Sequence, residues 1–221
     1  MSKITDYAFL KKTFGTSGVN VIGSFQLSQL NSSSVQSQLK AAGINTNSKQ
    51  YKAAVKQMMS AGNGAMYGNI QGIKNLMSHY DKDGDYINPV NGLAGLLVTD
   101  ENESSRKRII SIPDSSKEEM YELTKKEFLR ENGVHNGDTT KRTDVYNNLY
   151  RKMSKKDRLA AGYTLEKYER IYRQAFYDAA KKADPNWEIG KPIKDGALDS
   201  VTRETAESGK SPAQATLDTK I

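Results

Sequence analysis

Three carboxylates at alternate positions, Asp81, Asp83 and Asp85, are the residues whose types and spacing point most directly to chemistry. They stand in the segment Tyr-Asp-Lys-Asp-Gly-Asp-Tyr-Ile-Asn, where Gly84 allows the sharp turn that lets the carboxylate oxygens face one centre. A hard divalent cation such as Ca²⁺ prefers an oxygen-rich cage of this kind, whereas three like charges without a cation repel one another. The spacing therefore predicts a calcium loop.

Residues 81–92 resemble the first half of an EF-hand calcium loop, because the three aspartates fall at its first, third and fifth ligand positions. The second half departs from that pattern. Tyr86 stands where the EF-hand has Gly, and neither Asn91 nor Gly92 supplies the bidentate carboxylate of the twelfth position. The other ligands would be backbone carbonyls, water and nearby or more distant side chains: Asn88, Asn91, Asp100 and Glu101. Such a degenerate loop is expected to bind with a Kd on the order of 10⁻⁴ to 10⁻³ M.

The same residues also fit an ordinary turn, in which Asp side chains accept hydrogen bonds from nearby backbone amides. The flanking sequence predicts a helix on each side. Apolar residues recur at helical spacing before the loop, and Asn88-Pro89 can start a helix after it. The residues expected to anchor this second helix in the core are Val90, Leu93, Leu96 and Leu97. The context is a helix–acidic loop–helix hairpin, with or without a cation.

The remaining sequence predicts a mainly α-helical protein. Helices are expected from Ser32 to Gly43, from a cap at Asn47 or Ser48 to Gly62, and from a Ser115/Glu118 capping box to Asn132-Gly133. Another is expected around Val145, Leu149 and Met153. The strongest helical pattern begins at Thr164 and stops at Asp184-Pro185, with Trp187 packing back on it. At most a minor β element is expected, near 107–112.

Composition changes near residue 100. Residues 1–100 contain no Arg and no Glu and are rich in Ser, Asn, Gln and Gly, whereas the rest is dense in charge of both signs. We therefore expect two parts, residues 1–100 with the acidic loop, and residues 101–221 with a C-terminal tail. A mean hydropathy of -0.72 indicates that much of the chain is exposed.

The sequence favours a non-enzymatic function. Cysteine is absent, and the two histidines, His79 and His135, are too far apart for a His-rich metal site. Gly15-Thr16-Ser17-Gly18 is not a nucleophile elbow, and Gly62-Asn63-Gly64 lacks the Lys-Ser/Thr pair of a phosphate-binding loop. We expect no catalytic residues and no organic cofactor.

Basic charge supports the alternative function, a module that binds nucleic acid or another polyanion. The net charge is +7 and basic runs occur at 106–108 and 151–158. Five tyrosines are interleaved with these charges and would have to stack on bases: Tyr146, Tyr150, Tyr163, Tyr168 and Tyr172. Their spacing is that of a helical core, and acidic residues are mixed among the basic ones. Nucleic acid is therefore not the expected partner, and a protein partner remains open.

Two stretches, Tyr80 to Leu93 (YDKDGDYINPVNGL) and Met153 to Trp187, resemble an uncharacterised family from gut clostridial bacteria. The resemblance implies a bacterial accessory or surface-associated protein and no catalytic residues. The sequence contains no candidate membrane span and no Sec-type apolar segment near Met1. We therefore expect a bacterial binding or structural protein with a weak structural calcium site, at the cell surface or exported.

Overall fold

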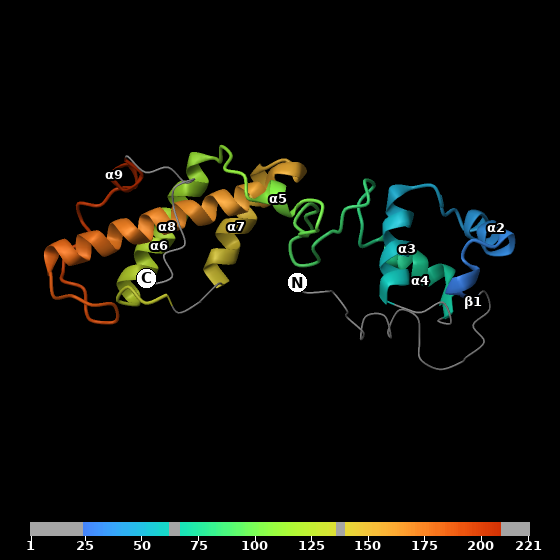
Figure 1. Ribbon diagram of the computed structural model, residues 1–221, viewed down its shortest axis with the longest axis horizontal. Coiled ribbons are helices and arrows are strands. Elements are labelled where there is room, and N and C mark those ends of the chain that lie inside the picture. The colour runs from blue at the N-terminus through green and yellow to red at the C-terminus, as the bar shows by residue number, and fades with distance from the viewer. Residues whose placement is uncertain (1–23, 62–66, 136–139, 209–221) are drawn as a thin grey trace. The chain divides into compact units, whose positions relative to one another are not determined.

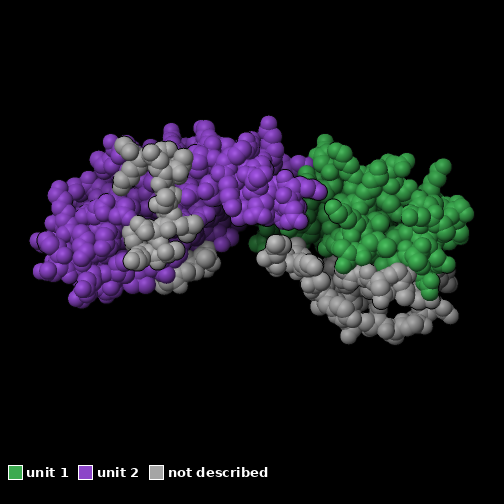
Figure 2. Space-filling view, in the orientation of Figure 1, with its two compact units in different colours: residues 1–97 green, residues 98–221 purple. Residues whose placement is uncertain are grey.

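The computed structural model describes residues 24–61, 67–135 and 140–208. The chain divides into two compact units, Met1–Leu97 and Val98–Ile221 (Figure 2). Helices make up most of the described structure, which confirms the mainly α-helical fold. The predicted domains, residues 1–100 and 101–221, stay a prediction. The expected C-terminal tail falls almost entirely outside the described residues.

The first unit joins three helices to a small sheet. Its elements in chain order are β1 (Ser24–Gln26), the 3-10 helix η1 (Leu27–Gln29), α2 (Ser33–Ala41), α3 (Lys49–Ala61), β2 (Tyr67–Asn69) and α4 (Ile70–Met77). The two strands pair antiparallel, with Phe25 opposite Gly68. The Ser32 hydroxyl accepts the Val35 amide at the start of α2, and the Ser48 hydroxyl accepts the Tyr51 amide at the start of α3. The predicted start of α2 is therefore confirmed, and of the two caps predicted for α3, Asn47 and Ser48, the structure has Ser48.

The core of this unit lies between α2, α3, α4 and the start of the chain's described part. Leu39, Met58, Ile73 and Leu76 are at most 2 % exposed. These side chains come from the apolar faces of three helices, as the spacing in the sequence requires. The core also extends beyond the end of α4, because Tyr80, three residues after Met77, is buried in the same cluster.

The helix predicted after Pro89 is wrong. Residues 89–91 form a turn, Ala94 forms an isolated β-bridge with Ile87, and no residue of 88–97 is helical. Val90 is 83 % exposed and Leu97 is 40 % exposed. Gly92 and Gly95 have φ values of 71° and 80°, which a right-handed helix does not contain. Asparagine side chains in this segment accept local amides and so compete with helical bonding. The acidic loop therefore follows a helix but does not lead into one.

The second unit is a helical assembly around one long helix. Its elements are α5 (Glu103–Arg106), α6 (Asp114–Arg130), α7 (Thr140–Lys152), the 3-10 helix η2 (Lys155–Asp157), α8 (Arg158–Ala183) and α9 (Arg203–Glu207). The long helix α8 packs against α6, α7 and α9 (Figure 1). None of the described helices is both long and apolar enough to cross a membrane.

The core of the second unit is rich in aromatic side chains. Phe128 and Phe176 are fully buried, with ring centroids 5.7 Å apart. Trp187 is 2 % exposed, lies 6.0 Å from Phe128 between ring centroids, and donates its Nε1–H to the Lys191 carbonyl. This confirms the prediction that Trp187 packs back onto the helix before it.

Three local predictions for this unit need correction. No described residue of 107–112 forms a strand, because the Ile110 amide donates to the Thr164 hydroxyl on α8 instead of to another strand. The helix α6 begins at Asp114, ahead of the predicted Ser115/Glu118 box, and its N-cap, Pro113, has no side-chain bond. The helix α8 begins at Arg158, since Ala160, Ala161 and Gly162 are buried and continue its packed face.

Candidate functional site

The predicted calcium loop is a turn centred on Asp81. Its Oδ1 accepts the backbone amides of Asp83 and Asp85, both at 2.9 Å. The Asp81 amide donates to the Asp85 carbonyl, and the Gly84 amide donates to the Asp81 carbonyl. The side chains of Asp83 and Asp85 are exposed. Asp81 therefore organises the backbone of the loop, as an Asp in a turn does.

The two predicted asparagine ligands also bond to the local backbone. Asn88 Oδ1 accepts the Val90 amide at 2.9 Å, and Asn91 Oδ1 accepts the Leu93 amide at 3.0 Å. Asp100 and Glu101, the more distant alternatives, belong to the second unit. Within the described ranges, no group of three or more His, Cys, Asp or Glu side chains is arranged to hold a metal ion. The predicted ligands thus share one loop but do not form a cage in this conformation.

The loop is fixed to the helix before it and to the start of α3. Gln50 Nε2 donates to the carbonyls of Met77 and Tyr80, at 3.0 and 2.8 Å. On the far side of the turn, a Cβ placed on Gly84 would lie 3.0 Å from the Lys49 carbonyl oxygen. Burial raises the pKa of Tyr80 to about 12, so the residue that enters the loop is anchored in the core. The loop, which follows α4, is therefore held against the start of α3.

We predict that Gly84→Ala will destabilise the first unit by about 2–3 kcal/mol. Gly84 has a φ of +85°, where a side chain costs roughly 1–2 kcal/mol, and the close Lys49 carbonyl adds a steric cost. Gly92→Ala is the matched control, because Gly92 has a φ of +71° and open space around its Cα. Urea unfolding followed by circular dichroism measures both. Equal losses for the two variants would show that Lys49 does not confine the loop.

A buried ion-pair network in the second unit joins three helices, and sequence reasoning did not anticipate it. Arg142 on α7 donates from Nη2 to Glu127 Oε2 on α6 at 2.5 Å. The same nitrogen lies 3.1 Å from Glu169 Oε1 on α8. All three side chains are about nine-tenths buried or more. The network therefore ties α6, α7 and α8 together through one guanidinium group.

Two further residues extend this network. Arg142 Nη1 lies 2.8 Å from His135 Nε2, and because a guanidinium only donates, this ring nitrogen accepts. Arg173 on α8 donates to the Gly133 carbonyl and lies over the Phe128 ring. Burial lowers the pKa of the Arg173 guanidinium. No local motif marks these residues, and the only signal in the sequence is a charged residue on an otherwise apolar helix face.

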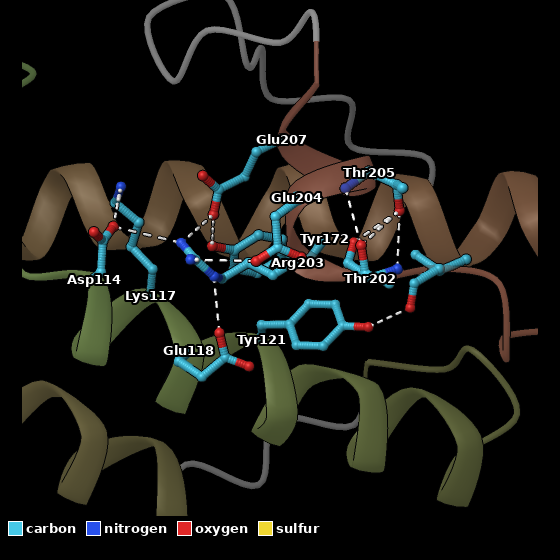
Figure 3. A network of polar contacts seen from close by, with 11 residues as sticks. Asp114, Lys117, Glu118, Tyr121, Tyr172, Thr202, Arg203, Glu204, Thr205 and Glu207 are labelled. Carbon is cyan, nitrogen blue, oxygen red and sulfur yellow. Dashed lines mark hydrogen bonds and ion pairs between the residues drawn. The ribbon is translucent and has the colours of Figure 1, made fainter.

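A second polar network holds α9 and the segment before it against α6 and α8 (Figure 3). Arg203 Nε lies 2.8 Å from Glu118 Oε2, and its Nη1 lies 3.3 Å from Glu207 Oε1. Tyr172 on α8 donates its hydroxyl to Glu207 at 2.6 Å, and Tyr121 on α6 donates to the Val201 carbonyl. Burial raises the pKa of Tyr172, so this phenol stays a donor at neutral pH. These contacts fix α9 and the segment before it to α6 and α8.

Three of the five tyrosines considered for base stacking belong to the core of the second unit or pack against it, whereas Tyr163 is half-buried with Lys167 Nζ over its ring. Tyr172 is fully buried, and Tyr146 and Tyr168 pack against the same cluster. Tyr150 is half-buried beside Gly162, whose added Cβ would lie 2.6 Å from the phenol oxygen. Their placement supports the core role expected from their spacing.

Comparisons with known proteins place the chain in one family. The model of a domain of unknown function, DUF3879, matches residues 44–221. The match covers α3, α4, the acidic loop and the whole second unit. Neither a search of curated proteins nor a search of solved structures found a match.

Proposed function

The chain belongs to the DUF3879 family of domains of unknown function, and we propose that it is a non-enzymatic binding or structural protein of a bacterium, exported or attached to the cell surface. Its acidic loop would bind Ca²⁺ weakly and stiffen the turn that packs against the start of α3. The Ser-, Asn- and Gln-rich, cysteine-free first part supports the proposed location by composition.

The main support for this proposal is that buried charged residues of the second unit contact one another and join its helices. Glu127, Arg142 and Glu169 are buried, and the two carboxylates both contact Nη2 of the one guanidinium. Catalytic acids and bases, in contrast, need an open site in which they meet a substrate. The buried charges here hold helices in place, which is the task of a rigid scaffold.

The calcium part of the proposal rests on the backbone of the loop. Asp81 already holds the backbone in a turn by accepting hydrogen bonds from two amides, and Gly84 adopts the positive φ that the turn requires. Asp83 and Asp85 are exposed, so a cation from the solvent can reach their carboxylates. A site that must assemble in this way from few carboxylates is expected to bind weakly.

We expect Ca²⁺ at about ten times Kd to stabilise the first unit by about 1.4 kcal/mol, which corresponds to a melting temperature higher by about 5–10 °C. Circular dichroism during heating, first in chelator and then in millimolar Ca²⁺, measures the shift. Trp187, the single tryptophan, reports only on the second unit, so its fluorescence transition should not move.

Asp83→Ala should remove the calcium-dependent shift, whereas Asp195→Ala, at an exposed aspartate of the second unit, should retain it. Both variants lose one negative charge, so the pair separates a site from general charge screening. An unchanged shift in Asp83→Ala, or no shift in the wild type with Ca²⁺ or Mg²⁺, would leave the loop as a turn only.

A further inference from the structure

Three basic segments that are separate in the sequence meet at the start of α8. Arg108 Nη2 lies 3.6 Å from Asp157 Oδ1, which brings residues 106–108 to residues 155–158. Arg158 Nε donates to the Tyr150 carbonyl at 3.1 Å, which brings the end of α7 to the same place. The short helix α5 also packs against α8 there (Figure 1). We call residues 106–109 and 151–158 the basic end.

The basic end carries eight Lys and Arg residues and one acidic residue, Asp157. Asp157 is engaged by Arg108, and Lys152 pairs with Glu119 outside the segment. Lys107, Arg151 and Lys156 are exposed and make no ion pair with any described residue. Positive charges that are spread over some fifty residues of sequence therefore lie together on one surface, and several of them have no acidic partner.

We infer that the basic end docks the protein on an anionic lipid surface. Clusters of four to eight basic residues attract anionic bilayers without any membrane-spanning element. Ile109, directly after the first basic run, is 37 % exposed, and an aliphatic side chain beside basic residues can enter the headgroup layer. Of the nearby tyrosines, Tyr146 packs against the core, and Tyr150 is half-buried with its ring centroid 6.0 Å from that of Tyr146. Neither is the open stacking platform that single-stranded nucleic acid uses.

This inference goes beyond the proposed calcium loop and involves none of its residues. Co-sedimentation of the full chain with mixed phosphatidylcholine–phosphatidylglycerol vesicles tests it, with pure phosphatidylcholine vesicles as the neutral surface. The triple variant Lys107→Ala, Arg151→Ala, Lys156→Ala should weaken binding to the mixed vesicles by about a hundred-fold, since each basic residue near an anionic surface contributes about five-fold.

The matched control is the triple variant Lys126→Ala, Lys182→Ala, Lys194→Ala. These lysines are also exposed, belong to the same unit and lie outside the basic end, so both triple variants lose three positive charges. The control should bind mixed vesicles within a few-fold of the wild type. The circular dichroism spectrum and melting temperature of each variant establish that it is folded.

Equal weakening by the two triple variants would overturn the inference, because net charge would then explain the binding. Absence of wild-type binding to mixed vesicles at low salt would also overturn it. Ile109→Ser should weaken vesicle binding by several-fold and leave the binding of duplex DNA unchanged. Binding to duplex DNA in preference to mixed vesicles would assign the basic end to nucleic acid and exclude the lipid assignment.

Discussion

Arg142→Met will lower the free energy of unfolding of the second unit by about 3–5 kcal/mol. The substitution leaves Glu127 and Glu169, which are 7 % and 8 % exposed in their side chains, without the guanidinium that both contact. A buried carboxylate without its partner must either stay charged in an apolar environment or take up a proton, and both cost free energy. Urea unfolding followed by Trp187 fluorescence measures the loss, because Trp187 is buried in the hydrophobic core of the second unit.

Two comparisons separate this effect from a general loss of charge. Lys191→Met removes the exposed pair with Glu188 and should leave the urea midpoint close to that of the wild type, because water screens an exposed ion pair. The triple variant Glu127→Leu, Arg142→Met, Glu169→Leu should recover most of the stability, since apolar residues of similar size often replace a buried ion pair without loss. A loss below about 1 kcal/mol in Arg142→Met would show that solvent reaches the two carboxylates.

The sequence predicted the helices wherever a local signal coincided with an apolar face. Ser32 and Ser48 cap α2 and α3 with their hydroxyls, and Gly43, with a φ of 77°, ends the first of these helices. Trp187 was placed correctly because a single large aromatic residue after a helix stop has few other places to be buried. These are short-range relations, which a sequence shows directly.

The errors arose where tertiary packing or side-chain bonding outweighed the local pattern. The apolar residues after Pro89 suggested a helix, but Asn88 and Asn91 bond to the backbone instead and Gly92 takes a positive φ. Residues 107–112 have strand-like composition, yet Ile110 bonds to Thr164 on α8, 54 residues later. The local sequence pattern cannot predict a hydrogen-bond partner that lies so far along the chain.

The candidate sites differ in the same way. The sequence located the acidic loop but not the direction of its oxygens, and Asp81 Oδ1 faces two amides. Glu127, Arg142 and Glu169 come from three helices, and only the packing of α6, α7 and α8 brings them together. The basic end likewise needs the contact between Arg108 and Asp157. Site residues that one loop supplies are predictable, and those that several helices supply are not.

Trp187→Ala should cost the second unit about 3–5 kcal/mol, as the removal of a buried aromatic side chain does elsewhere. Trp187 contacts Phe128 and Tyr177 and donates to the Lys191 carbonyl, so the substitution removes ring packing and leaves a cavity. Trp187→Phe should cost less, because it keeps part of the ring packing and loses the hydrogen bond. Circular dichroism in urea measures both, since the fluorescent residue is lost.

Gly133 provides an independent check on the packing of this tryptophan. Gly133 has a φ of +81°, and an added Cβ would lie 2.9 Å from Trp187 Cη2, so Gly133→Ala combines backbone strain with a clash. In the Trp187→Ala background the clash is absent and only the strain of positive φ remains, about 1–2 kcal/mol. The two substitutions should therefore cost less together than the sum of their separate costs, by at least about 1 kcal/mol. Strict additivity would mean that Trp187 does not lie against Gly133, and the aromatic core would then end at Phe128.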